Sequence, residues 1–245
     1  EQYKYDIPLP STLTQAEKEE LRTVEQRLTT ALDIQKAPKE AVSKAYDVFQ
    51  KTNIQRSGTG FTGAPILTPD ELDRSKGEIS WNDLETMLSG FAYDAYYNHS
   101  GSSRQNYFTV WDFAINQGFS FGSGMGTNHH YGYQVRKIYT TAWLMRDAIW
   151  KAPNRDNILS TLIFWSALQE TRQPYQYGRD ELLDSWHTLL MAKTVSALLF
   201  TDERERVRAL KGLSRWVLSY QETSKYKIPF FRKCIIRFLP TSFSG

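Results

Sequence analysis

Apolar residues recur at the three- and four-residue spacing of amphipathic helices through most of this chain. Thr14 and Glu17 have the spacing of a capping box, in which two polar side chains satisfy the free backbone groups at a helix start. Ser80 and Asp83 repeat this signal further along. A helix is therefore predicted to begin at each box. The apolar stripes that follow are Leu21, Val24, Leu28 and Leu32 after the first box, and Trp81, Leu84, Leu88, Phe91 and Ala95 after the second.

The same spacing predicts six further helices, and alternating strand patterns are almost absent. Asn154 is expected to cap one helix, and Gly118 is expected to end another in the left-handed conformation. Long loops are predicted where glycine, threonine, serine and proline gather. Antiparallel helical hairpins follow from this pattern, packed as a bundle, a solenoid or a toroid. The further helices are expected around residues 42–49, 103–117, 135–150, 154–168, 180–200 and from 201 or 202 onward, with loops at 57–69 and 118–126.

Composition indicates a globular protein with an unusual share of aromatic residues. The chain has 245 residues, of which 40% are hydrophobic and 23% charged, and this favours one large folded domain over disorder. It contains 7 Trp, 14 Tyr and 13 Phe. Flat amphipathic rings can hold sugar faces, although most of them are expected to lie in the core.

Charge and cysteine usage narrow the classes of partner. A net charge of +3 is too weak for a nucleic-acid-binding face, whereas acidic sugars stay open as ligands. A single cysteine, Cys234, excludes an intramolecular disulfide. No apolar run reaches the roughly 18 residues that cross a bilayer. The first ten residues lack the features of a signal peptide, so an exported protein would already have lost its signal.

The densest group of chemically versatile side chains follows the glycine-rich segment at 118–126. Arg136 is suited to pairing with a carboxylate or sulfate, the histidines to hydrogen bonding or proton donation, and the tyrosines to stacking on sugar rings. The alternative is that one histidine caps a helix and the tyrosines pack. Adjacent histidines lack the i, i+4 spacing of metal ligands on a helix, so no metal site is predicted. The group comprises Asn128, His129, His130, Tyr131, Tyr133 and Arg136.

The other histidines carry weaker signals. His187 falls on an apolar stripe and is interpreted as a core residue, whereas His99 is placed at a helix C-terminus. The sequence contains no Walker motif.

Residues 126–139 and the segment Leu-Met-Arg-Asp-Ala at 144–148 resemble the chondroitin sulfate ABC lyases of polysaccharide lyase family eight. The resemblance implies an all-α fold, an incomplete α/α toroid of antiparallel helical hairpins, followed in full-length enzymes by β-sheet domains. It implies β-elimination at a uronate without a cofactor, an acidic polysaccharide as partner, and a secreted or periplasmic location. Asn128, His129 and His130 are then candidates for neutralising the substrate carboxylate, and Tyr131, Tyr133 and Arg136 for binding the polysaccharide.

The resemblance also leads to an expectation about the end of the chain. The family's main His/Tyr acid–base pair lies in a later segment of the form D-G-x-x-x-x-H-x-x-x-Y, which is missing here. Residues 225–245 form instead a basic and apolar tail, interpreted as a truncation or frame-shift product, with a membrane-surface or partner-binding tail as the alternative. The domain is thus expected to be helical over residues 1–224, with an extended lead-in at 1–13.

Three functions stay open at this point. The first is a lyase-family protein that binds uronate-containing glycosaminoglycans, of the chondroitin sulfate or hyaluronan type, and turns them over poorly or not at all. The second is a non-catalytic helical carbohydrate-binding module. The third, an α/α-toroid glycoside hydrolase, requires a pair of carboxylates in a cleft. The choice of glycosaminoglycan, endo or exo action and the oligomeric state are left open.

Overall fold

The computed structural model describes residues 7–33, 36–63, 65–66, 79–118, 131–166, 168 and 182–223, and within these ranges it leaves out the side chains of 131–135, 182–189 and 218–223. This part of the chain is mainly helical, which confirms the all-α class; whether the helices complete a toroid stays a prediction. The helices are α1 (Gln15–Leu32), α2 (Lys39–Thr52), α3 (Trp81–Tyr97), α4 (Gly101–Asn116), α5 (Tyr131–Leu144), α6 (Arg146–Trp150), α7 (Arg155–Trp165), α8 (Leu182–Leu198) and α9 (Glu203–Thr223).

Both predicted capping boxes are present. The Thr14 hydroxyl accepts a hydrogen bond from the Glu17 backbone N–H at 3.2 Å, and the Glu17 carboxylate accepts from the Thr14 N–H at 2.8 Å. Ser80 and Asp83 make the equivalent pair at the start of α3. Two further predictions about helix ends are confirmed, because His99 follows the C-cap of α3 and Gly118 ends α4 with a positive φ of 87°.

Three local predictions were wrong or incomplete. The helix expected over 135–150 is divided at Met145, where the Arg146 guanidinium donates to the Trp143 carbonyl at 2.9 Å and lies over its indole ring. Asn154 precedes α7 but makes no capping bond, because its amide donates to Asp112 instead. The loop expected from residue 57 begins inside a short antiparallel hairpin of β1 (Gln55–Ser57) and β2 (Gly60–Thr62), which closes through Gly58 at a φ of 61°.

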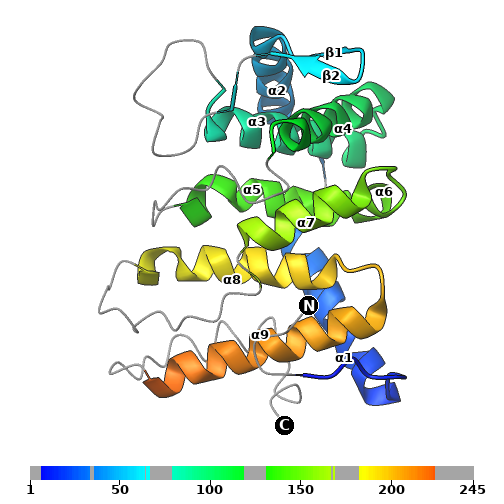
Figure 1. Ribbon diagram of the computed structural model, residues 1–245, viewed down its shortest axis with the longest axis vertical. Coiled ribbons are helices and arrows are strands. Elements are labelled where there is room, and N and C mark those ends of the chain that lie inside the picture. Colours follow the sequence, from blue (N-terminus) through cyan, green and yellow to red (C-terminus); the bar gives the residue numbers. More distant parts are fainter. Residues whose placement is uncertain are drawn as a thin grey trace.

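The helices are stacked in layers along the long axis of the molecule (Figure 1). α2 packs on α3 and α3 on α4 at one end, while α8 packs on α9 at the other. α5 lies between them, in contact with both α3 and α8. α8 and α9 run antiparallel around a short turn, and the starts of α5 and α8 lie on the opposite side of the molecule from that turn (Figure 1, left).

Aromatic side chains fill the centre, as expected for most of them. Trp81, Trp111, Trp143 and Trp165 are all almost fully buried. The Trp165 ring meets Trp81 edge to face at a centroid distance of 4.8 Å and stacks on Trp111 at 5.8 Å. These rings therefore join α3, α4 and α7 in one core and do not form a sugar-binding surface.

α2 and α3 approach each other closely at Gly90 of α3. A Cβ atom at this position would lie 2.5 Å from the Ala45 Cβ and closer still to the Ala41 carbonyl oxygen. Real Cβ atoms essentially never come this near to their neighbours. Only glycine therefore allows the two helices to pack at this separation.

Arg206 joins α9 to α1. Its guanidinium lies 3.1 Å from the Glu25 carboxylate of α1, donates to the Phe200 carbonyl at 2.6 Å and lies 4.5 Å above the Trp150 ring. Only 10% of the Arg206 side chain is exposed. A second ion pair, between Lys211 and Glu17 at 2.6 Å, strengthens the same α1–α9 contact.

Candidate functional site

The structure describes only part of the residue group singled out by the sequence. Asn128, His129 and His130 lie outside the described residues, so their arrangement stays a prediction. The backbones of Tyr131 and Tyr133 form the first turn of α5. Arg136 is described in full and is exposed. The segment therefore leads into a helix start, where backbone N–H groups and the helix dipole favour bound anions.

α5 is held firmly on its inner side. Ile138, Tyr139 and Ala142 are fully buried, and the Tyr139 hydroxyl donates to the Leu162 carbonyl of α7 at 2.6 Å. The Trp143 indole N–H donates to the Thr29 hydroxyl of α1 at 3.1 Å. These contacts fix the rotation of α5 about its axis. Arg136 and Lys137 consequently lie on its exposed side.

A buried carboxyl group lies beneath this cationic pair. Glu85 of α3 is 8% exposed, and its Oε2 accepts a hydrogen bond from the Lys137 backbone N–H at 3.3 Å. Burial raises the pKa of Glu85 to about 7, against the opposing effects of the Lys137 N–H and of the Lys137 and Arg136 charges. Burial also raises the pKa of Tyr93, on the same helix, and the charge of Glu85 contributes to this rise. Below neutral pH, Glu85 is therefore largely protonated and leaves the charge of Arg136 uncompensated.

Sequence reasoning missed Glu85. The signal was available, because Glu85 lies one helical turn after Trp81 and beside Leu84 and Leu88, on the stripe predicted to be buried. An acidic residue on such a stripe is rarely fully buried unless it is paired, and it marks a candidate site.

Replacing Glu85 with glutamine is expected to change how stability depends on pH. The folded state binds the Glu85 proton more tightly than the unfolded chain, whose carboxyl has a pKa near 4.5. Its contribution to stability is therefore fully present below about pH 4.5 and is lost as the pH rises to about 7. Over this interval the wild type should lose roughly 1 to 3 kcal/mol relative to Glu85→Gln.

Urea unfolding of both proteins between pH 4.5 and 8 measures this difference. The exposed Glu19, changed to glutamine, is a matched control that should leave the pH profile unaltered. Parallel profiles for wild type and Glu85→Gln would show that the carboxyl is not titrating in this range.

Two other features are absent from the described ranges. No cluster of three or more histidine, cysteine, aspartate or glutamate side chains there could hold a metal ion. Among the helices of that same part of the chain, none is both long and apolar enough to cross a bilayer.

Comparison with known proteins gives the exposed surface of α5 a context. A family model described as "Lyase, catalytic" matches residues 7–227. The chain is 25% identical over 235 residues to the chondroitin sulfate ABC exolyase of Bacteroides thetaiotaomicron. The aligned region covers 87% of this chain and 23% of that enzyme. The chain is 27% identical over 115 residues to the chondroitin sulfate ABC endolyase of Proteus vulgaris, covering 46% of this chain and 11% of that enzyme. The chain thus spans less than a quarter of either relative.

Proposed function

Because this chain belongs to the catalytic lyase-domain family, as a chondroitin lyase-like polysaccharide lyase, we propose that it binds uronate-containing glycosaminoglycans where α5 begins. The observation that carries the proposal is the exposed Arg136, on a helix that contacts the buried Glu85 through the Lys137 N–H and whose other face is anchored in the core. The proposed ligand is a glycosaminoglycan of the chondroitin sulfate or hyaluronan type. The protein is proposed to be secreted or periplasmic.

Arg136 is proposed to pair with a carboxylate or sulfate of the polysaccharide. A guanidinium presents several N–H donors in one plane, which matches the two oxygens of a carboxylate. Lys137 is the next residue and adds a second positive charge at the same level of the helix. A protonated Glu85 does not compete with the ligand for these charges. Affinity for an acidic sugar should therefore rise as the pH falls through 7.

The reaction proposed for this site is β-elimination. The carboxylate of the uronate is neutralised, the proton on C5 is removed, and the C4–O bond breaks as the leaving oxygen is protonated, so that a C4–C5 double bond forms. Negative charge accumulates at the carboxylate during this step, and donors placed in advance stabilise it. Asn128, His129 and His130 are proposed for this role, with Tyr131 and Tyr133 stacking on the sugars. Since the sequence holds no D-G-x-x-x-x-H-x-x-x-Y segment, we propose binding with little turnover by these 245 residues.

Removing the Arg136 side chain is expected to weaken binding. Arg136→Ala should lower affinity for a sulfated chondroitin oligosaccharide by about 1 to 3 kcal/mol, since a hydrogen bond to a charged group is lost. This corresponds to roughly 5- to 150-fold in Kd. Titration calorimetry measures the loss, and Arg22→Ala, which removes an exposed arginine from α1, is the charge-matched control. Equal affinities for Arg136→Ala and wild type would remove Arg136 from the site.

The chemistry of the products distinguishes the candidate functions. Incubation with chondroitin sulfate or hyaluronan gives ultraviolet-absorbing unsaturated ends if the chain is a lyase, and reducing ends without that absorbance if it is a hydrolase. The proposal expects binding in calorimetry with slow or undetectable release of unsaturated ends. Rapid release would contradict the expectation of little turnover, and hydrolytic products would contradict the elimination.

A further inference from the structure

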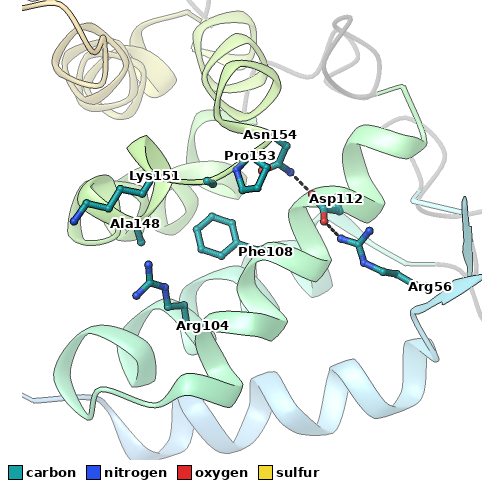
Figure 2. A pocket seen from close by; sticks show the side chains of 9 residues that line it. Arg56, Arg104, Phe108, Asp112, Ala148, Lys151, Pro153 and Asn154 are labelled. Carbon is teal, nitrogen blue, oxygen red and sulfur yellow. Dashed lines mark hydrogen bonds and ion pairs between the residues drawn. The ribbon is translucent and has the colours of Figure 1, made fainter. Parts of the chain in front are cut away.

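A second cationic site lies at the opposite end of α5. A pocket of about 650 Å³ is formed by α4, the β1 strand, α6 and the turn between α6 and α7. Its volume falls in the range of small-molecule sites, roughly 300–1,000 Å³. Figure 2 shows the Phe108 ring at its centre, with Arg104 and Lys151 on one side and the Arg56–Asp112–Asn154 group on the other.

The pocket has an excess of positive charge. Arg56, Arg104 and Lys151 contribute three cations and Asp112 one anion, which leaves a balance of +2. The two carboxylate oxygens of Asp112 accept hydrogen bonds from Arg56 and Asn154, so Asp112 offsets the charge of Arg56. Arg104 and Lys151 are exposed and, among the described residues, their side chains make no ion pair. Two cations are therefore available to a ligand.

The apolar part of the pocket lies between these charges. Phe108 is half-buried, packs against the core and leaves part of its ring facing the pocket. Ala148, Ala152 and Pro153 form the opposite wall. A flat apolar ring beside separate cations suits a ligand with one apolar face and an anionic substituent. A sulfated sugar ring has this combination, because its C–H groups cluster on one face and its sulfate projects from the edge.

The position of the pocket separates it from the α5 start. Arg136 and Ala148 are 12 positions apart, on two helices that meet at Met145, and the helical rise of 1.5 Å per residue allows up to about 18 Å between them. α6 and the start of α5 also lie on opposite sides of the molecule in Figure 1, right and left respectively. One small sugar cannot occupy both places.

We propose that this pocket is a second carbohydrate-binding site, which holds a sulfated sugar of the same polysaccharide through Arg104 and Lys151 with Phe108 beneath the ring. The proposal rests on the proposed function for the choice of ligand, but uses none of the residues of the α5 start. A polymer attached at the pocket raises the local concentration of its other sugars near the protein. Long chains should therefore be retained better than short ones.

Methyl NMR of the alanines tests the proposal, because Ala148 and Ala152 lie in the wall and Ala142 is a buried reference. The probes are inorganic sulfate and a sulfated chondroitin disaccharide. The disaccharide should shift the Ala148 and Ala152 signals, and the double variant Arg104→Ala/Lys151→Ala should weaken this effect at least tenfold. Lys18→Ala/Lys44→Ala removes the same charge from exposed positions of α1 and α2 and should change it less than twofold.

The outcomes separate this site from the α5 start. Sulfate binding as tightly as the disaccharide would overturn the sugar-binding claim in favour of an ion site. Undisturbed Ala148 and Ala152 signals, with binding that depends on Arg136, would overturn the second site and leave the proposed function intact. Shifts that persist in Arg136→Ala, without any other Arg136-dependent binding, would support the pocket and contradict the α5 site.

Discussion

Gly90→Ala is expected to destabilise the protein by about 3 kcal/mol or more. The new methyl group would lie 2.5 Å from the Ala45 Cβ and would also meet the Ala41 carbonyl oxygen. Neither neighbour is the end of a flexible side chain, so α2 would have to move away from α3. This movement would disturb the edge-to-face contacts of Phe91 with Tyr46 and Phe49, which lie in the same interface.

Gly212 provides the matched control for this substitution. It also lies inside a helix, α9, but a Cβ there would meet only the Ile7 side chain at 3.9 Å. Gly212→Ala should therefore stabilise the protein by up to about 1 kcal/mol, through helix propensity. Chemical denaturation of the two variants measures both effects. A loss below 1 kcal/mol for Gly90→Ala would mean that α2 and α3 are free to separate.

Arg206→Ala is expected to cost about 2 to 4 kcal/mol. The substitution leaves the Glu25 carboxylate, which is 28% exposed, without its ion pair and the Phe200 carbonyl without its donor. It also removes the guanidinium from the Trp150 ring. The measurement is again the free energy of unfolding.

Arg204→Ala is the control for Arg206. Arg204 pairs with Asp202 only two residues away, and both side chains are well exposed. Little change in stability is expected, because exposed local ion pairs contribute little. Equal effects of the two substitutions would show that the α1–α9 connection does not depend on Arg206.

Features that depend on neighbouring residues were predictable from the sequence. The capping boxes at Thr14 and Ser80 and the left-handed end at Gly118 involve groups within four residues of one another. The residues that form each feature are close together in the sequence, so the starts of α1 and α3 were predicted correctly. The family assignment rested on a local segment in the same way, and comparison with known proteins confirmed it.

Features that depend on distant residues were not predictable. Asn154 has the side chain of a helix cap, yet its amide is taken by Asp112, 42 residues earlier in the chain. The pocket draws Arg56, Arg104 and Lys151 from three separate elements, and no sequence spacing unites them. Glu85 is intermediate, because the stripe predicts its burial but only the approach of α5 supplies its partner.

The contact between the first and last described helices has a consequence for biosynthesis. Glu25 and Arg206 are 181 residues apart, so a ribosome adding about 5 to 20 residues per second needs about 10 to 40 s to deliver the second partner after the first. During that time the apolar stripe of α1 has no α9 to cover it. Trp143 of α5, whose indole N–H donates to the Thr29 hydroxyl, is synthesised earlier than α9, so α1 can pack against α5 first. The surface of α1 that contacts α9 therefore stays uncovered in the nascent chain until Arg206 and Lys211 have been added.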